Sequence, residues 1–301
     1  MCLRRLGYAC LCLSVEGSSP RGARLRNATP DRLRELIAAN LDGLEAVMRF
    51  NAAHAVRLFR ISSDVIPFGS HPVNDLPWWD LFGDQLSVIG SLVRGADLRV
   101  SMHPGQYTLL SSPDPAVTRN AVLDLAYHAR VLDALGLDAT HKLVIHVGGA
   151  YGDPASALER WTRNVERLEP SIRARLVVEN DERLFGARDV LRLSELTGVP
   201  VVLDVLHERV FAGPAADAEL PDLLRAAFRS WRTSDGVPKM HYASQSQSRR
   251  AGAHADYVDA AEFAAFLQHI APAEQCFDCM LEAKAKDLAL FTLRQELGLA
   301  A

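Results

Sequence analysis

Short apolar runs alternate with longer amphipathic segments along the chain, and this alternation constrains the fold more than any other feature. The apolar runs are rich in Val, Ile and Leu, which is typical of strands buried on both faces. Strands that alternate with helices predict right-handed crossovers and a parallel sheet. Eight such units close into a barrel more readily than they form an open sheet, so we predict a single (β/α)8 TIM barrel over residues 1–301.

The expected elements follow from this pattern. The strands are Leu6–Leu13, Ala55–Ile61, Asp97–Met102, Lys142–Val147, Leu176–Glu179, Val201–Val205, Pro238–Tyr242 and Cys276–Ala283. The helices are Pro30–Asn51, Trp78–Arg94, Pro115–Leu135, Pro154–Leu168, Ala187–Leu196, Leu220–Trp231, Val258–Ile270 and Asp287–Leu297. The least regular stretches, Ser62–Pro77, Pro104–Asp114 and Ser244–Asp256, follow strands, so we expect them at the C-terminal mouth, where active sites of this fold are built.

Composition narrows the class of protein. The chain has 301 residues, of which 49% are hydrophobic, and such a chain folds without disulfide staples. Five scattered cysteines fit a reducing cytoplasm, where we expect the protein to act. The basic pair Arg4-Arg5 is followed by too short an apolar stretch to predict an export signal, and no run predicts a membrane partner. The net charge of −4 argues weakly against nucleic acid. We expect a monomer without an obligate protein partner.

Polar side chains end six successive apolar runs. They are His103, His146, Glu179, Asp204, His241 and Glu282, with Lys239 and His207 close by. Period-two alternation puts Asp204 on the face of Val202, so such side chains converge on the barrel axis. Any one histidine could be a solvated strand end. Together, crowded carboxylates and imidazoles are costly unless a cation holds them, and the set suits Mn, Zn or Fe rather than Ca. Sites with several such ions activate water and clamp the oxygens of a phosphodiester.

These positions belong to an ordered set of motifs that spans the chain. The set is Arg60-Ile61-Ser62-Ser63-Asp64, Ser70-His71-Pro72, His103-Pro104-Gly105-Gln106-Tyr107, Glu179-Asn180-Asp181, Asp204-x-x-His207, Lys239-x-His241 and His254-x-Asp256-Tyr257. From about Leu6 to Glu282, this order resembles the UV damage endonuclease family, metal-dependent barrels related to endonuclease IV and to xylose isomerase-like enzymes. The resemblance implies a hydrolase that cuts double-stranded DNA immediately 5′ of cyclobutane pyrimidine dimers, 6-4 photoproducts and, in some members, abasic sites. We expect 3′-hydroxyl and 5′-phosphate products.

The resemblance also implies residue roles. The family's metal-site positions match His71, His103, His146, Glu179, Asp204, His207, His241, His254 and Glu282. Two to three divalent ions are implied, with Mn²⁺ as the first expectation and Zn²⁺, Fe²⁺ or Mg²⁺ as alternatives. Glu179, Lys239 and His71 are the expected catalytic residues. Glu179 has two oxygens and can bridge two ions, and Lys239 matches a lysine that can be carboxylated in the family. Unmodified, Lys239 would repel the ions, contact a phosphate or pack inside the barrel.

Candidate contacts to the lesion and to DNA complete the expected site. They are Gln106, Tyr107, Tyr8, Arg249 and Arg250. The first two match residues that probe the lesion, since a planar ring and an amide can fill the gap left by an extruded dimer. Tyr8 is a weaker match that equally suits the core. The arginines lie in a polar loop, which is either a phosphate contact or a solvated surface. Cys12 stands where the family usually has Asn, which puts in doubt any contact of that amide.

Two other functions stay open at the level of sequence. A sugar isomerase on the same barrel would use two ions in an enclosed pocket to polarise a carbonyl. His207 and His254 instead favour a third ion and an open groove. A protein that binds distorted DNA without cutting it would keep its function when Glu179 or Asp204 is replaced by Ala, whereas a nuclease would lose cleavage.

Overall fold

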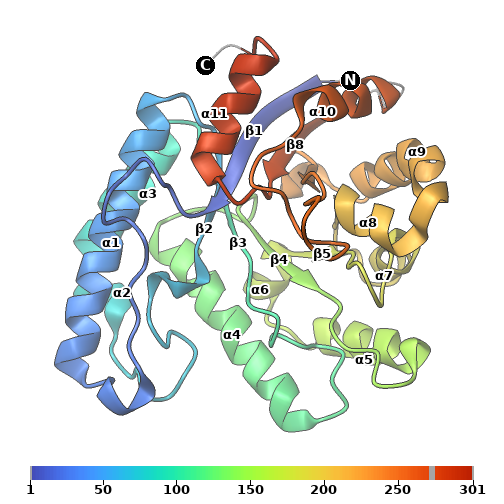
Figure 1. Ribbon diagram of the computed structural model, residues 1–301. Coiled ribbons are helices and arrows are strands. Elements are labelled where there is room, and N and C mark those ends of the chain that lie inside the picture. Colours follow the sequence, from blue (N-terminus) through green and yellow to red (C-terminus); the bar gives the residue numbers. More distant parts are fainter. Residues whose placement is uncertain (1, 271–274, 300–301) are drawn as a thin grey trace.

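The computed structural model describes residues 2–270 and 275–299. In this part of the chain, eight parallel strands pair in sequence order, and β1 pairs with both β2 and β8, so the sheet closes on itself (Figure 1). The strands are β1 (Cys2–Cys10), β2 (Leu58–Ile61), β3 (Arg99–Met102), β4 (Lys142–His146), β5 (Leu176–Glu179), β6 (Val201–Asp204), β7 (Lys239–Tyr242) and β8 (Cys276–Leu281). The predicted TIM barrel is therefore confirmed.

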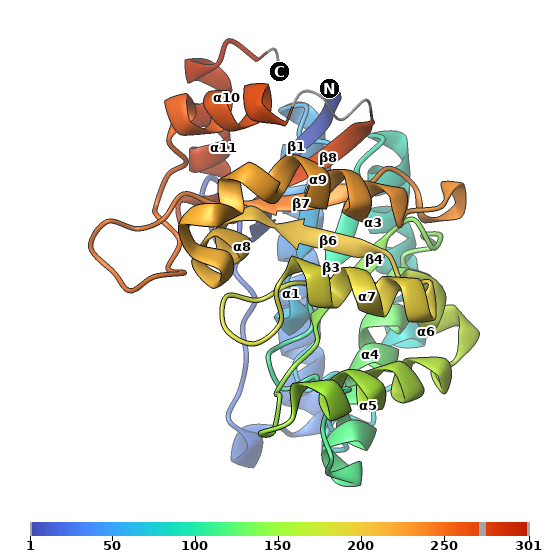
Figure 2. The same ribbon diagram turned by 90° about the vertical axis from the view of Figure 1, so that its right-hand side faces the viewer.

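Helices cover the outside of the barrel in both views (Figures 1 and 2). The longer helices are α1 (Pro30–Ala53), α3 (Gly83–Gly95), α4 (Pro115–Ala134), α5 (Pro154–Glu166), α7 (Ala187–Thr197), α9 (Ala216–Arg229), α10 (Ala260–His269) and α11 (Lys286–Glu296). The shorter helices are α2 (Trp78–Leu81), α6 (Pro170–Arg175) and α8 (Val205–Ala212). Among the residues described, none of these helices combines the length and the hydropathy that a bilayer crossing requires.

Several elements differ from the expected ones, and helix α6 has no counterpart among them. Strand β1 begins at Cys2 rather than Leu6, because it pairs with β8 from that residue onward, and it ends at Cys10, whose φ of +73° interrupts the extended chain. The expected helix over residues 78–94 is divided into α2 and α3 at Phe82, whose ψ of 21° departs from helical geometry. Helix α8 was not expected, because it follows β6 without a linker that would announce it.

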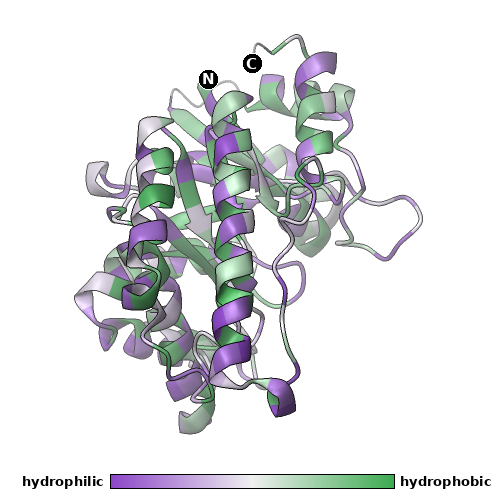
Figure 3. Cartoon of the chain, turned by 90° about the vertical axis from the view of Figure 1, so that its left-hand side faces the viewer, coloured by the Kyte–Doolittle hydropathy of each residue, from purple (hydrophilic) through white to green (hydrophobic). Residues whose placement is uncertain are grey.

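The core lies mainly between the barrel and its helices. In α1, Thr29 caps the first turn by accepting the Arg32 N–H, and Pro30 occupies the first helical position. Leu33, Ile37 and Leu41 then recur on one face and are buried against the strands. Figure 3 shows this alternation of hydrophilic and hydrophobic bands along the helix that faces the viewer. The helix layer thus holds the strands in register and leaves their carboxyl ends free to carry polar groups.

Candidate metal centre

The strand-ending residues meet at the C-terminal mouth of the barrel. They are His103 directly after β3, His146 at the end of β4, Glu179 at the end of β5, Asp204 at the end of β6, His241 within β7 and Glu282 directly after β8. The register supports the expected convergence, because Glu179 is aligned with His146 and Asp204 with His241 on neighbouring strands. The closure of the barrel thus brings Glu179 close to Glu282, which is more than a hundred positions away in the sequence.

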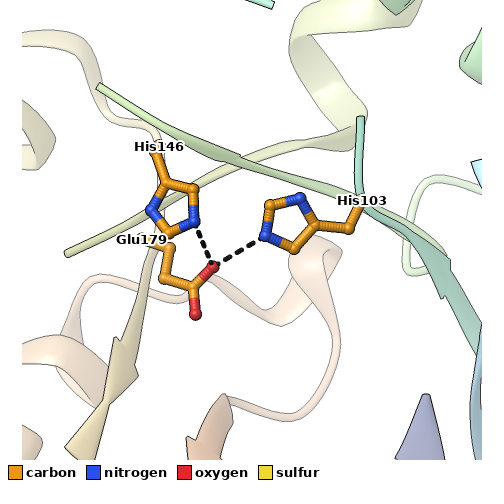
Figure 4. Close-up of side chains that lie close together, drawn as sticks. All are labelled: His103, His146 and Glu179. Atoms are coloured by element: carbon orange, nitrogen blue, oxygen red, sulfur yellow. Dashed lines mark hydrogen bonds and ion pairs between the residues drawn. The ribbon is translucent and has the colours of Figure 1, made fainter. Parts of the chain in front are cut away.

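Glu179 is the centre of this arrangement. Its Oε2 atom lies 3.0 Å from His103 Nε2 and 3.5 Å from His146 Nε2, and both rings point at this oxygen (Figure 4). Its Oε1 atom lies 2.5 Å from His241 Nδ1. Glu179 is only 1% exposed, so each carboxylate oxygen is directed to protein groups on a different side of the site.

Two groups of ligand atoms share this glutamate. His103, His146 and Glu179 form one group, and Glu179, Asp204, His241 and Glu282 form the other, with the atoms of each group within 4.8 Å of one another. A carboxylate can bind one ion through each oxygen, which an imidazole nitrogen cannot do. The geometry therefore suits Glu179 as a bridge between two cations.

The charged groups of the site shift the pKa values of their neighbours. Burial raises the pKa of the Glu179 carboxyl, but the neighbouring His241 and His146 outweigh this effect, so its pKa is well below the ordinary value. Burial lowers the pKa of His207, but the carboxylates of Asp204, Glu179 and Glu282 raise it to about 9. Without a cation, the carboxylates thus hold a proton on this imidazole at neutral pH. A metal ion that uses this nitrogen would have to displace that proton.

Unsatisfied atoms and donor chemistry fit a divalent cation. Asp204 Oδ1 accepts the His207 backbone N–H at 2.8 Å and caps α8, whereas the buried Asp204 Oδ2 has no hydrogen-bond partner in the described part of the chain. The second ligand group contains three carboxylates, which repel one another unless a cation lies between them. Imidazole nitrogens and carboxylate oxygens are the ligands of Mn, Fe and Zn sites. The residues at this mouth therefore fit divalent metal ions.

The remaining expected histidines lie at different distances from this centre. The rings of His146 and His207 have their centroids 5.8 Å apart, and those of His207 and His254 are 6.1 Å apart, so these histidines continue the ligand cluster across the mouth. His254 Nδ1 lies 3.8 Å from Glu282 Oε2. His71 is exposed on the segment between β2 and α2, where its Nδ1 accepts the Val73 N–H, and it belongs to neither ligand group.

Lys239 and Tyr8 lie deeper than the sequence pattern suggests. Lys239 opens β7 two residues before His241, so its fully buried side chain lies inside the barrel rather than at the rim. Its Nζ atom has no hydrogen-bond partner among the described residues, and burial together with Arg99 and Arg60 lowers its pKa far below the ordinary value. Tyr8 is also fully buried, and its hydroxyl donates to Asn51 Oδ1 of α1 at 2.7 Å. In this conformation Tyr8 packs in the core and does not reach the surface.

The candidate DNA-contacting residues are exposed around the mouth. Tyr107 is 79% exposed and follows the exposed Gln106 on the segment that leads from His103 to α4. Arg249 and Arg250 are exposed on the segment between β7 and α10, which projects from the barrel (Figure 2, orange loop). A backbone bridge between Gln245 and His254 pairs the two sides of this projection and holds His254 near its base. Cys12, in contrast, is buried.

Supporting residues were not identified as such from sequence. Arg60 of β2 is buried, and its guanidinium lies 3.1 Å from His241 Nε2 and contacts Glu282. A charged residue within an otherwise apolar strand is the signal that marks it. Ser63 donates to the backbone oxygen of His103 at 2.7 Å, and the buried His128 of α4 contacts the same hydroxyl. No sequence pattern links Ser63 to His128, because their contact depends on the packing of α4.

Comparisons with known proteins agree with this geometry. The model of the family described as UV-endonuclease UvdE matches residues 4–300. A UV DNA damage endonuclease of Clostridium perfringens is 34% identical over 286 residues, which cover 95% of this chain and 68% of the relative. One of Bacillus velezensis is 38% identical over 306 residues, which cover 98% and 94%. The crystal structure of SacUVDE superimposes with a TM-score of 0.90 at 31% identity, covering 98% of this chain and 99% of the other. The chain belongs to the UV-endonuclease UvdE family.

Proposed function

We propose that this protein is a metal-dependent DNA repair endonuclease that cuts the backbone immediately 5′ of UV photoproducts. Its substrates would be cyclobutane pyrimidine dimers and 6-4 photoproducts in double-stranded DNA, with abasic sites as a further substrate. The cut would leave a 3′-hydroxyl and a 5′-phosphate. The protein would act as a monomer in the cytoplasm, at the nucleoid.

The observation that carries this proposal is the sharing of Glu179 by two ligand groups at the open end of the barrel. Divalent ions bound there would supply Lewis-acid activation of water and neutralise charge on a phosphodiester. We expect two to three ions, with Mn²⁺ favoured over Zn²⁺, Fe²⁺ or Mg²⁺. The relatives named UV DNA damage endonuclease support damaged DNA as the substrate.

The residues of the cluster would bind different ions. Glu179, Asp204, His241 and Glu282 would hold ions at the centre, and His103 and His146 would complete the side nearest the segment that carries Tyr107. His207 and His254 would hold a further ion. Asp204 caps α8, so the residue that would ligate an ion also fixes the backbone of His207. This double use keeps the ligands in place before DNA arrives.

Groups outside the ligand cluster would handle the substrate. Tyr107 and Gln106 are exposed beside His103 and are free to fill the gap left by an extruded lesion. Arg249 and Arg250 would contact phosphates from the projecting loop. His71 lies on the segment after β2 and would have to move toward the ions or contact the DNA to act as a catalytic residue.

Lys239 is the residue whose chemical state matters most. Its lowered pKa favours the neutral amine, which is the form that carbon dioxide can modify. A carboxylated Lys239 would place a negative group beneath Glu179 and beside Arg60, in a position where the unmodified Nζ has no partner. Mass spectrometry of the intact protein, prepared with and without bicarbonate, would detect this modification.

A plasmid assay tests the proposed function. Supercoiled DNA, irradiated or not, is incubated with the protein and Mn²⁺, and the nicked form is measured on a gel. We expect nicking of irradiated DNA alone, its loss when EDTA removes the metal, and its recovery when Mn²⁺ is returned. An end-labelled duplex with one dimer then locates the cut. Only background nicking of both plasmids would contradict the proposal.

A further inference from the structure

A groove of about 700 Å³ lies outside the barrel, between α4 and α5. These two helices are neighbours on the outside of the barrel (Figures 1 and 2). Four arginines line it, Arg119 from α4 and Arg160, Arg163 and Arg167 from α5 and its C-terminal cap, and no aspartate or glutamate is among its lining residues. We call it the arginine groove. It takes no part in the metal centre described above.

The positive charge of this groove has no ion-pair partner among the residues that the structure describes. Other surface arginines form ion pairs, such as Arg188 with Glu219 and Arg225 with Asp222, but the four groove arginines form none within the described part of the chain. Arg119, Arg163 and Arg167 are exposed. The whole chain has a net charge of −4, so this concentration of guanidinium groups does not follow from composition. Its chemistry is complementary to a polyanion.

Two hydrogen bonds link α5, which lines the groove, to the segment that carries Tyr107. Arg160 Nε donates to the backbone oxygen of Ser111 at 2.7 Å, and Asn164 Nδ2 donates to that of Leu110 at 2.8 Å. Ser112 and Pro113, which follow in the same segment, line the groove. The helix that carries three of the arginines therefore holds the backbone of the segment that carries Tyr107.

The row of arginines is long enough to contact several phosphates of a nucleic-acid backbone. Residues 160, 163 and 167 recur on one face of α5, and they span roughly 10 Å along the helix axis at about 1.5 Å per residue. One strand of duplex DNA presents a phosphate every ~3.4 Å along its axis, so several phosphates fit within this reach. A single small anion would use only part of the groove.

We propose that the arginine groove binds the phosphate backbone of the duplex that flanks the damaged site. This inference rests on the proposed function, because it takes the substrate of the mouth as the occupant of the groove. The guanidinium groups would contact phosphates without reading bases, so the groove would add affinity and orientation and not sequence preference. The bonds from Arg160 and Asn164 to the Tyr107 segment would align this contact with the lesion.

A salt titration of DNA binding tests the groove. Metal-free protein in EDTA is titrated against a fluorescein-labelled duplex of about 30 base pairs with one dimer, at several salt concentrations, and anisotropy gives the Kd. The variant is Arg163→Gln with Arg167→Gln, which leaves Arg160 and its loop contact intact. Each lost phosphate contact lowers the slope of log K against log salt by about 0.9, so we expect a slope shallower by about 1.8 and a weaker Kd at low salt.

A control variant separates the groove from net charge. Arg225→Gln with Arg229→Gln on α9 removes the same charge at the same helical spacing, and we expect it to bind like the wild type. Circular dichroism melting checks that both variants are folded. Equal slopes for the wild type and the groove variant would overturn the proposal and leave an acidic protein segment as the occupant of the groove. An equal loss in the α9 variant would also overturn it.

Different results would contradict the proposed function and the groove proposal. If the wild type nicks irradiated plasmid and the groove variant keeps the wild-type slope, the groove proposal fails alone. If the wild type nicks neither plasmid and the groove variant still has the shallower slope, the proposed function fails and the groove remains a DNA contact.

Discussion

Charged side chains are buried at both ends of the barrel, around Glu179 at the mouth and around Arg99 at the base. At the base, Arg99 donates to Asp278 Oδ2 at 2.8 Å and to the backbone oxygens of Thr140 and Asp235. Lys142 similarly donates to Asp235 Oδ1 at 2.6 Å. These cations have anionic or carbonyl partners supplied by the chain itself.

The mouth has the opposite arrangement. Three carboxylates lie within one ligand group, and the buried Asp204 Oδ2 has no partner. Their charge is compensated by histidines, whose charge depends on protonation, and by Arg60. A buried carboxylate that faces permanent cations of the chain, as Asp278 faces Arg99 and Arg5, stabilises one conformation. A cluster with more carboxylates than permanent cations is instead suited to bind a metal ion. The difference separates the part of the barrel that maintains the fold from the part that we propose binds metal ions.

The largest effect should come from removing the shared ligand at the mouth. Glu179→Gln keeps the size of the side chain but loses the charge that both ligand groups use. We expect the rate of nicking to fall on the order of a hundred- to a thousandfold. The variant should also lose most of the rise in Tm that Mn²⁺ gives the wild type, because binding to the folded state is what raises Tm.

Glu219→Gln is the matched control for this change. Glu219 lies on α9 and pairs with Arg188 at the surface, so its replacement should leave both nicking and the Mn²⁺-dependent rise in Tm unchanged. Wild-type nicking by the Glu179 variant would show that the shared carboxylate is not part of the chemistry. It would also remove the distinction between the two ends of the barrel.

A substitution at the base of the barrel should lower stability and leave activity unchanged. Asp278→Asn removes the negative charge beside the buried Arg99, and Arg5 also loses a partner at 3.6 Å. Breaking a buried pair leaves an uncompensated charge, so we expect the free energy of unfolding to fall by about 3 kcal/mol. Urea denaturation measures this change, with the slope of unfolding free energy against urea unaltered. The nicking rate at a temperature where the variant is folded should stay at the wild-type level.

The location of the mouth residues could be predicted from sequence, but their depth and partners could not. A polar residue at the end of a buried strand must lie at the carboxyl end of the barrel, and this rule brought His146, Glu179 and Asp204 together. The same alternation places Lys239 on the face of His241 but does not say that it lies one layer deeper. Depth depends on the stagger of the closed sheet, which no local pattern encodes.

The contacts that the helices make could not be predicted from the sequence either. Tyr8 lies in a strand with the pattern of a site residue, but its hydroxyl binds Asn51 because α1 packs over β1. The spacing of Arg160, Arg163 and Arg167 indicates one face of α5, but a groove forms only because α4 lies next to that face. Local patterns therefore predict which residues share a face, and tertiary packing decides what that face meets.

The smallest effect concerns a histidine at the base. Burial lowers the pKa of His141 to about 4, and its ring Nδ1 accepts the Val100 N–H at 3.1 Å, which requires the neutral ring. In the unfolded chain this pKa is about 6.5, so the unfolded state binds the proton more readily and stability falls as pH drops below 6.5. By pH 5 this group alone should lower the free energy of unfolding by about 2 kcal/mol.

Urea denaturation of the metal-free protein at pH 7.5 and pH 5 measures this loss. In the variant His141→Asn the amide oxygen can accept the same N–H, so the variant should lose about 2 kcal/mol less than the wild type. His207 at the mouth has a raised pKa and stays protonated across this range, so it leaves the difference between the two proteins unaffected. An identical loss of stability in both proteins would show that protonation of His141 is not its cause. The acid sensitivity of the base would then come from other groups.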